Sequence, residues 1–214
     1  MPLPIRFDFL LAGCANPNLA FSQKFKRTPS NWAAWQIATA LGISKYTGLA
    51  RIECIQPMYN LVKRQAEVEI LPLALAEQVG VISYSPLGGG LLSGKYSTRN
   101  MPDAGRLVSN EMYTRRYGLP IYYEVAERFT EHAQERGIHP AALAVAWVMS
   151  NPALTAPIIG ARNVDQLAAS LAAVDVDMTP EWRAEISALS VEPAPATDRL
   201  EEKSGIVYAG AKAK

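Results

Sequence analysis

Short apolar segments alternate with helical segments from about residue 30 onward, and this alternation constrains the fold more than any other feature of the sequence. Residues 51–56, 81–84 and 154–159 are runs of four to six residues that end at proline, a polar residue or glycine, as strands commonly do. A helical pattern follows each of them. Strands and helices that alternate in this way form parallel sheets, because each helix returns the chain to the start of the next strand. We therefore expect an α/β fold.

The helical segments have recognisable ends. A first helix is expected over residues 32–41, capped by Ser30 or Asn31 and ended by Gly42. Pro72 lies inside the second pattern, so that helix is expected to begin late or to bend there. The expected helices after the first are residues 66–78, 121–136, 141–149 with Pro140 in its first turn, 164–173, and 180–189 with Thr179 as its cap, while residues 97–120 show no sustained period. This order fits two architectures, a doubly wound sheet or part of a (β/α)8 barrel, and periodicity alone does not distinguish them.

Composition limits the size of the domain and its partners. The chain has 214 residues, of which 49% are hydrophobic, enough for one buried core. Residues 1–29 and 193–214 differ in character from the rest, so the folded domain is expected to span residues 30–192. The net charge of +1 provides no strongly basic surface for nucleic acid. Apolar stretches stop short of the roughly 18 residues that a membrane span needs. We expect neither a nucleic-acid nor a membrane partner.

Cysteine usage indicates the compartment. The two cysteines, Cys14 and Cys54, have no CxxC spacing and no neighbouring histidine. We therefore expect no disulfide and no metal site, and a reducing, cytoplasmic setting. Residues 11–14, Leu-Ala-Gly-Cys, have the form of a bacterial lipoprotein cleavage site. Asp8 interrupts the apolar run before them, which is shorter than such signals require, so we interpret the match as chance.

Four polar or glycine-rich loops follow the expected strand positions. They are Ser30-Asn31, residues 56–60 (Gln-Pro-Met-Tyr-Asn), residues 84–90 (Tyr-Ser-Pro-Leu-Gly-Gly-Gly) and residues 160–163 (Gly-Ala-Arg-Asn). In an α/β barrel, the loops at the carboxyl ends of the strands form the active site. Each loop alone is commonplace, because a Ser-Asn pair is usually a helix cap and a glycine run is usually a flexible loop. Their order and spacing together are much less common.

In their order and spacing, these loops resemble those of the aldo-keto reductase family. The resemblance is to the bacterial branch that is related to the potassium-channel β subunits. The resemblance runs from Ser30 to Leu189 and is most specific over residues 53–61, 84–96 and 157–167. It implies an α/β fold that is the C-terminal half of a TIM (β/α)8 barrel, incomplete in this chain. It also implies an NADP(H) cofactor bound across the strand ends without a Rossmann glycine motif.

The resemblance also implies a role for individual residues. Ser30, Asn31 and Gln56 match the residues that hold the nicotinamide carboxamide, and Tyr84 matches the aromatic that stacks on the ring. The matches to the pyrophosphate loop are Ser85, Pro86, Leu87, Gly88 and Gly89, and the phosphate, 2′-phosphate and adenine contacts match Lys95, Arg106, Gly160, Arg162 and Gln166. The acid-asparagine pair that the family has at the adenine is Ala169-Ser170 here.

The catalytic residues of the family have no counterpart in this sequence. The family uses a tyrosine as proton donor, a lysine and an aspartate that tune it, and a histidine that orients the carbonyl substrate. All four belong upstream of the position that Ser30 matches. Here the only histidines are His132 and His139, and no tyrosine precedes Tyr46. We therefore expect no catalytic residue and no turnover by this chain alone, and interpret the sequence as a truncated or frame-shifted gene or a wrongly chosen start.

Three interpretations remain open: an oxidoreductase whose active site is rebuilt by dimerisation or by a companion chain, a catalytically dead NADP-binding or regulatory module, and a fragment without activity. In each case, three strands that do not close into a barrel within one chain would leave edges unpaired. The sequence therefore predicts self-association through exposed strand edges.

Overall fold

A computed structural model describes residues 28–98, 101–103 and 105–197 of the chain. The expected lipoprotein motif at residues 11–14 and most of the two expected end segments lie outside these described residues. The described elements, in order, are α2 (Ala34–Thr47), β1 (Cys54–Ile55), η1 (Gln65–Glu67), α3 (Ile70–Ala76), β2 (Gly80–Tyr84), η2 (Gly88–Ser93), α4 (Arg106–Ser109), α5 (Glu111–Tyr117), α6 (Pro120–Glu135), α7 (Pro140–Met149), β3 (Ala156–Ile158), α8 (Val164–Leu171), η3 (Ala172–Asp175) and α9 (Pro180–Ala188).

The expected parallel sheet is confirmed. Its three strands follow the order β1-β2-β3, with Cys54 opposite Gly80 and Ile82 opposite Ala156. An isolated parallel bridge between Ser30 and Gln56 extends the sheet beyond β1. The described sheet is open, with β3 at one end and the segment that ends at Ser30 at the other.

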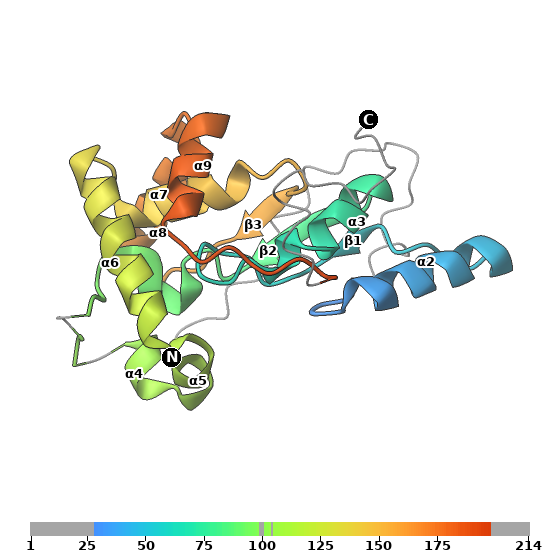
Figure 1. The fold of residues 1–214 in the computed structure, drawn as a ribbon, viewed down its shortest axis with the longest axis horizontal. Coiled ribbons are helices and arrows are strands. Elements are labelled where there is room, and N and C mark those ends of the chain that lie inside the picture. The colour runs from blue at the N-terminus through green and yellow to red at the C-terminus, as the bar shows by residue number, and fades with distance from the viewer. Residues whose placement is uncertain (1–27, 99–100, 104, 198–214) are drawn as a thin grey trace, which may run out of the picture.

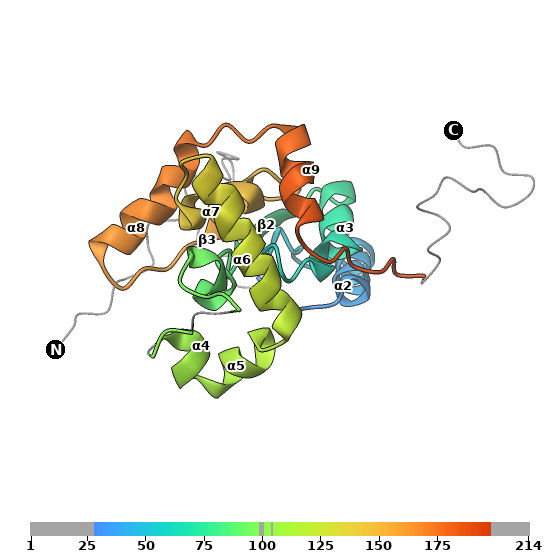
Figure 2. The same cartoon turned by 60° about the vertical axis from the view of Figure 1, so that its left-hand side comes forward.

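Helices cover the sheet unevenly. In Figure 1, α2 lies at one end of the molecule and helices α4 to α9 gather toward the other. Figure 2 shows α8 on the opposite side of the molecule from α2. Along β2, Val81 and Ser83 are fully buried, whereas Ile82 and Tyr84, which point to the opposite face, are only half-buried. One face of the sheet is therefore packed into the core and the other is less covered.

The core lies between the sheet and helices α6 and α7. As expected from its apolar composition, α7 is buried almost all round, from Ala141 to Val148. Trp147 and Phe129 are among the largest fully buried side chains. The N-terminal cap of α9 is also as expected, because the Thr179 hydroxyl accepts a hydrogen bond from the Trp182 backbone N–H at 3.2 Å. No helix in the described ranges is both long and apolar enough to cross a bilayer.

The expected limits of the first helix were wrong. Helix α2 begins at Ala34, and the Gln36 side chain accepts a hydrogen bond from the Ala33 backbone N–H at 2.9 Å. Ser30 cannot cap it, because its hydroxyl donates to the Gln56 carbonyl instead. The helix continues through Gly42 and ends at Gly48, which has a φ of 71°.

One further expectation needs correction, and another is confirmed. Residues 97–120 contain the short helices α4 and α5, which are too short to show a period in the sequence. Asn110 caps α5 by accepting hydrogen bonds from Met112 and Tyr113. The second helix does begin late, at Ile70, after the separate 3-10 turn η1. Pro72 is accommodated in the first turn of α3, where its missing N–H has no helical partner to lose.

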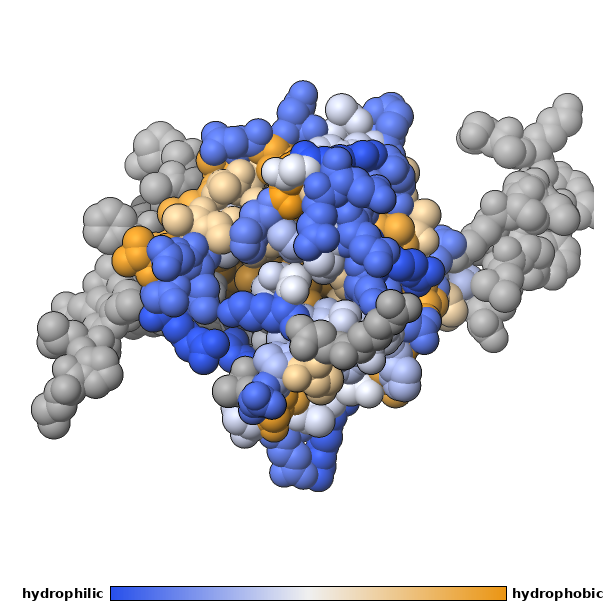
Figure 3. Space-filling view, turned by 90° about the vertical axis from the view of Figure 1, so that its left-hand side faces the viewer, coloured by the Kyte–Doolittle hydropathy of each residue, from blue (hydrophilic) through white to orange (hydrophobic). Residues whose placement is uncertain are grey.

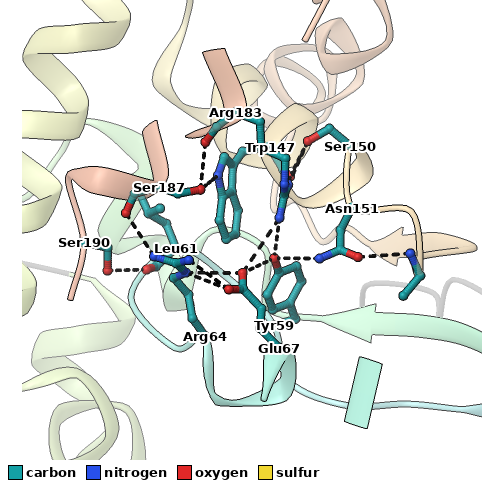
Figure 4. Close-up of polar contacts among 11 residues, drawn as sticks. Tyr59, Leu61, Arg64, Glu67, Trp147, Ser150, Asn151, Arg183, Ser187 and Ser190 are labelled. Atoms are coloured by element: carbon teal, nitrogen blue, oxygen red, sulfur yellow. Dashed lines mark hydrogen bonds and ion pairs between the residues drawn. The ribbon is translucent and has the colours of Figure 1, made fainter. Parts of the chain in front are cut away.

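A polar cluster joins the loop after β1 to η1, α7 and α9 (Figure 4). The fully buried Tyr59 hydroxyl donates to Glu67 Oε1 at 2.5 Å and accepts from Arg183 Nη2 at 2.8 Å. Arg183 also donates to the Trp147 carbonyl and to the Ser150 hydroxyl. The pKa of the Tyr59 hydroxyl lies well above its usual range, mainly because the group is buried, so it stays protonated.

A second arginine completes this cluster. Arg64 donates to both oxygens of the Glu67 carboxylate and to the Ser187 carbonyl in α9. The guanidinium of Arg183 lies 4.6 Å from the centre of the Trp147 ring. The partly buried charges are therefore paired and hydrogen-bonded, which is the condition for tolerating charge inside a fold.

Replacing Arg183 with methionine should lower the free energy of unfolding by about 3 kcal/mol, because it leaves Glu67 and the Tyr59 hydroxyl with fewer partners in a buried setting. Urea unfolding followed by circular dichroism measures the change. The control is Arg115→Met, which removes an ion pair whose partners are both nearly 80% exposed, and should change stability by less than about 1 kcal/mol. Equal effects of the two variants would contradict a central role for the cluster.

Candidate functional site

Four of the residues singled out from the sequence meet at the carboxyl ends of the strands. The Gln56 carbonyl accepts hydrogen bonds from the Ser30 hydroxyl at 3.0 Å and from the Asn31 backbone N–H at 3.4 Å. The Tyr84 hydroxyl donates to Asn31 Oδ1 at 2.7 Å. This group, which we call the strand-end group, is defined by Ser30, Asn31, Gln56 and Tyr84. The bond to Asn31 fixes the Tyr84 hydroxyl beside one amide side chain, and the Gln56 backbone carbonyl holds the Ser30-Asn31 segment next to it.

The loop after β2 has an unusual backbone. Ser85 has a φ of 58°, a conformation that favours glycine, and Gly88, Gly89 and Gly90 all have positive φ. The buried side-chain amide of Asn60 donates to the Ser85 carbonyl at 2.9 Å, and this contact holds the strained residue in place. At Gly89, an added Cβ would lie 2.7 Å from Tyr113 Cδ1. Glycine is thus required there by both conformation and space.

A cleft of about 750 Å³ runs beside this loop. It extends from the glycine loop past α4 to the start of α8. Nine of the fourteen sequence-predicted site residues line it: Ser85, Pro86, Leu87, Gly89, Lys95, Arg106, Gly160, Arg162 and Gln166. Gly88 lies beneath the loop against Leu91, Tyr117 and Val62, and the strand-end group lies outside the lining.

The cleft carries uncompensated positive charge. Lys95, Arg106 and Arg162 line it, and among the described residues none of the three forms an ion pair. The Arg106 guanidinium instead lies 5.2 Å from the centre of the Tyr113 ring. Asp165 is the one acidic side chain in the lining. Such a cleft suits an anionic ligand with more than one phosphate.

The far end of the cleft is built from the start of α8. Asn163 caps this helix by accepting a hydrogen bond from the Gln166 backbone N–H at 2.9 Å. The Gln166 side-chain oxygen accepts from the Arg162 backbone N–H at 3.1 Å. That bond leaves the Gln166 amide nitrogen for a ligand and fixes the backbone from which Arg162 projects. The Arg162 side chain itself is exposed.

Sequence reasoning missed three residues that shape the site. Asn60 was identified only as part of a loop motif, although it also donates to the Tyr117 hydroxyl at 3.2 Å. Tyr117, the second of these residues, is fully buried under the loop, and this burial is the main reason that its pKa is raised. His139 lines the cleft and caps α7, because its Nδ1 accepts from the Ala141 backbone N–H at 3.0 Å. A histidine directly before a proline-initiated helix was the available signal.

The notable difference between the two histidines is their burial. His139 is exposed at the start of α7, as expected of a residue beside a surface helix end, and it also lines the cleft. His132 is buried, and its Nε2 accepts a hydrogen bond from the Trp182 indole N–H at 2.9 Å. That bond ties α6 to α9, so the role of His132 is structural.

A lysine-tyrosine pair does occur in the described part of the chain, but it lies elsewhere. Lys63 Nζ donates to the Tyr122 hydroxyl at 2.9 Å, and neither residue lines the cleft. Within the strand-end group the tyrosine is Tyr84, whose proton is directed at Asn31. Over the described ranges, three or more His, Cys, Asp or Glu side chains nowhere gather in a way that could hold a metal ion.

Comparison with known proteins identifies relatives of this chain. Residues 29–191 match the Aldo/keto reductase family. The chain is 37% identical over 153 residues to the uncharacterized oxidoreductase YrpG of Bacillus subtilis, covering 71% of this chain and 44% of the relative. It is 32% identical over 166 residues to protein tas of Escherichia coli (73% and 48%) and 34% identical over 158 residues to a probable voltage-gated potassium channel subunit beta of rice, Oryza sativa subsp. japonica (71% and 48%). The chain thus spans less than half the length of these relatives.

The substitution Gly89→Ala should lower the free energy of unfolding by roughly 1–2 kcal/mol, because alanine is disfavoured at a φ of 71° and its methyl group would displace Tyr113. The matched control is Gly42→Ala, in the middle of α2 with open space around it, which should raise stability by up to about 1 kcal/mol. Urea titration of both variants tests the sign of each change. A Gly89→Ala variant as stable as the unmodified chain would show that the loop is not held as described.

Proposed function

Because this chain belongs to the aldo/keto reductase family, we propose that residues 30–192 are the C-terminal half of a (β/α)8 barrel and bind NADP(H) in the cleft. The observation that carries this proposal is the cleft itself, in which three unpaired cationic side chains stand beside a glycine loop at the carboxyl ends of parallel strands. Active sites of such barrels lie at these strand ends. Residues 1–29 and 193–214 are proposed to lie outside the domain.

The donor set of the cleft fits a dinucleotide phosphate. The backbone N–H of Gly89 can approach a pyrophosphate closely, because glycine leaves no Cβ atom in the way. The N–H groups of Gly88 and Gly90 already donate to carbonyls within the loop. Lys95 and Arg106 also line the cleft and would add positive charge. Arg162 would hold the 2′-phosphate, since a guanidinium binds phosphate through paired hydrogen bonds.

The strand-end group would receive the nicotinamide. The side-chain amides of Asn31 and Gln56 and the Ser30 hydroxyl can hydrogen-bond a carboxamide, and the Tyr84 ring offers a surface for stacking. At the other end, Gln166 would contact the adenine through its amide nitrogen. Ala169 lines the cleft where the family has an acid, and the Ser170 hydroxyl donates to the Gln166 carbonyl at 3.1 Å. The adenine end therefore relies on fewer polar contacts.

We propose that this chain by itself does not reduce its expected substrate, a small carbonyl compound. A bound NADPH supplies hydride, but the carbonyl oxygen must also receive a proton. The tyrosine of the strand-end group directs its proton at Asn31, and the Lys63-Tyr122 pair does not line the cleft. No described residue is therefore assigned a catalytic role.

A second candidate function is a catalytically silent module that binds NADP(H) and regulates a partner. The observation in its favour is that nine of the cofactor residues line one cleft, while the tyrosine of the strand-end group donates its proton to Asn31. Relatives named as potassium channel β subunits are compatible with such a role. Cofactor binding without turnover is the signature of this alternative.

The variant Arg162→Ala should weaken NADPH binding at least about tenfold while leaving NADH binding nearly unchanged, because NADH lacks the 2′-phosphate. Titration of nicotinamide fluorescence measures both dissociation constants. Arg115→Ala, which removes an exposed arginine of α5 outside the cleft, should leave both unchanged. An equal loss for NADPH and NADH in Arg162→Ala would remove the assigned role of this residue, and no binding of either by the unmodified chain would refute the proposal.

The absence of turnover is tested separately. The purified chain, mixed with NADPH and a panel of small aldehydes and ketones, should show no carbonyl-dependent loss of absorbance at the nicotinamide wavelength. Steady turnover that disappears in the variant Tyr84→Phe would contradict the assignment of Tyr84 to stacking alone. Binding of NADPH in the same preparation serves as the control for a folded cleft.

A further inference from the structure

Helix α2 has two apolar faces. Ile37 and Leu41 are buried against the core. On the opposite side, Trp35, Ile43 and Tyr46 are 68%, 50% and 88% exposed. These three side chains lie within one stripe along the helix. Steps of eight and three residues are close to whole turns of an α-helix, so the side chains project from the same side. We call them the α2 stripe.

Helix α8 and the turn η3 repeat this pattern at the other end of the sheet. Ser170 and Ala173 are buried, whereas Val164, Leu171 and Val174 are 79%, 52% and 70% exposed. These three residues form the α8 stripe. In Figure 3, hydrophobic side chains likewise interrupt the hydrophilic surface of the face toward which α4 to α8 gather. Each end of the described sheet thus carries an apolar helix face that is not packed against another described helix.

The two stripes have matching directions. Helix α2 follows the strand position that ends at Ser30, and α8 follows β3, so both start at the carboxyl end of the sheet and run antiparallel to the strands. The views in Figures 1 and 2 agree in placing α2 and α8 at opposite ends of the molecule. The stripes cannot meet within one chain. They can meet between two chains.

We propose that the two stripes are the contact surfaces of a dimer in which a second copy of this chain closes the sheet. A two-fold axis parallel to the strands brings β3 of each copy beside the Ser30 segment of the other and keeps all strands parallel. Each copy provides four strand positions, the Ser30 segment and β1 to β3. Two copies provide the eight of a closed barrel, which has no free edge. This inference rests on the proposed barrel but not on cofactor binding.

Opposite charges at the C-terminal ends of the two stripes support a second copy of this chain as the partner. Lys45, in the last turn of α2, is the only charged side chain of that helix. Asp175 ends η3, and Asp165 and Asp175 are the only charged side chains of α8 and η3. Since both helices start at the same end of the sheet and have similar lengths, Lys45 of one copy lies level with Asp175 of the other. This charge pattern favours contact of α2 of one copy with α8 of the other, with the two helices parallel, over contact of α2 with α2.

Closure would also cover the exposed face of the sheet. Ile82, Tyr84 and Ile158 are only half-buried in the single chain. In the closed arrangement these side chains would face their counterparts from the second copy across the barrel interior. The same change that covers the stripes would thus complete the packing of the sheet.

Sedimentation velocity of the full 214-residue chain over a range of concentrations tests the proposal. The unmodified chain should be a dimer. Leu171→Arg in the α8 stripe and Tyr46→Arg in the α2 stripe should each weaken dimerisation roughly tenfold or more. Because both copies carry the substitution, it places a charge in each of the two contacts between an α2 stripe and an α8 stripe. Met112→Arg is the matched control, since Met112 is 53% exposed in α5, outside both stripes, and the dimer should persist.

Reversing the charges of Lys45 and Asp175 gives a second test in case a stripe variant misfolds. Both side chains are exposed, so their replacement should not disturb the fold. Lys45→Glu should weaken the dimer about threefold or more, and adding Asp175→Lys should restore it. A monomer at all concentrations, open-ended oligomers, or a dimer that Leu171→Arg leaves intact would each overturn the proposal. A monomer that still binds NADPH would overturn only this inference, and leave the proposed function standing.

Discussion

Arg183 joins three parts of the chain that are distant in the sequence. From α9 it reaches the carbonyl of Trp147 in α7 and the hydroxyl of Tyr59 in the loop after β1. Tyr59 in turn donates to Glu67, which Arg64 holds in place. The two guanidinium groups share the Glu67 carboxylate and also donate to backbone carbonyls, so this polar cluster can exist in a partly buried setting. It fixes the course of the loop that leaves β1, and the candidate site is built on that loop.

The consequence for the site follows from chain adjacency. Asn60 comes directly after Tyr59, and its amide holds the carbonyl of Ser85 at the start of the glycine loop. Ser85 keeps its unfavourable backbone conformation because Asn60 is itself fully buried and positioned. The polar cluster therefore supports the basic cleft through adjacent residues, from Tyr59 to Asn60 and from Asn60 to the Ser85 carbonyl. Support for a ligand site by residues that do not contact the ligand is a general feature of preorganised sites.

Much of this arrangement could be predicted from the sequence where the signal is local. The all-round apolar helix α7, the Thr179 cap and the three parallel strands follow from composition and periodicity. The short helices α4 and α5 could not be found, because four and seven residues do not establish a period. The start of α2 was misjudged because Ser30, a good cap by type, is engaged by Gln56 from a distant strand. Asn60 gains its role only from tertiary contacts, whereas the cap that His139 provides for α7 is local and only its place in the cleft depends on the fold.

The central claim is that the basic cleft binds NADP(H). Hydrogen-deuterium exchange of the chain with and without NADP+ tests it most directly. The account predicts slower exchange on binding for backbone amides of residues 85–95 and 160–170, and no change in α9, which carries Arg183 but lies away from the cleft. Unchanged exchange in both segments, or protection confined to α9, would contradict it.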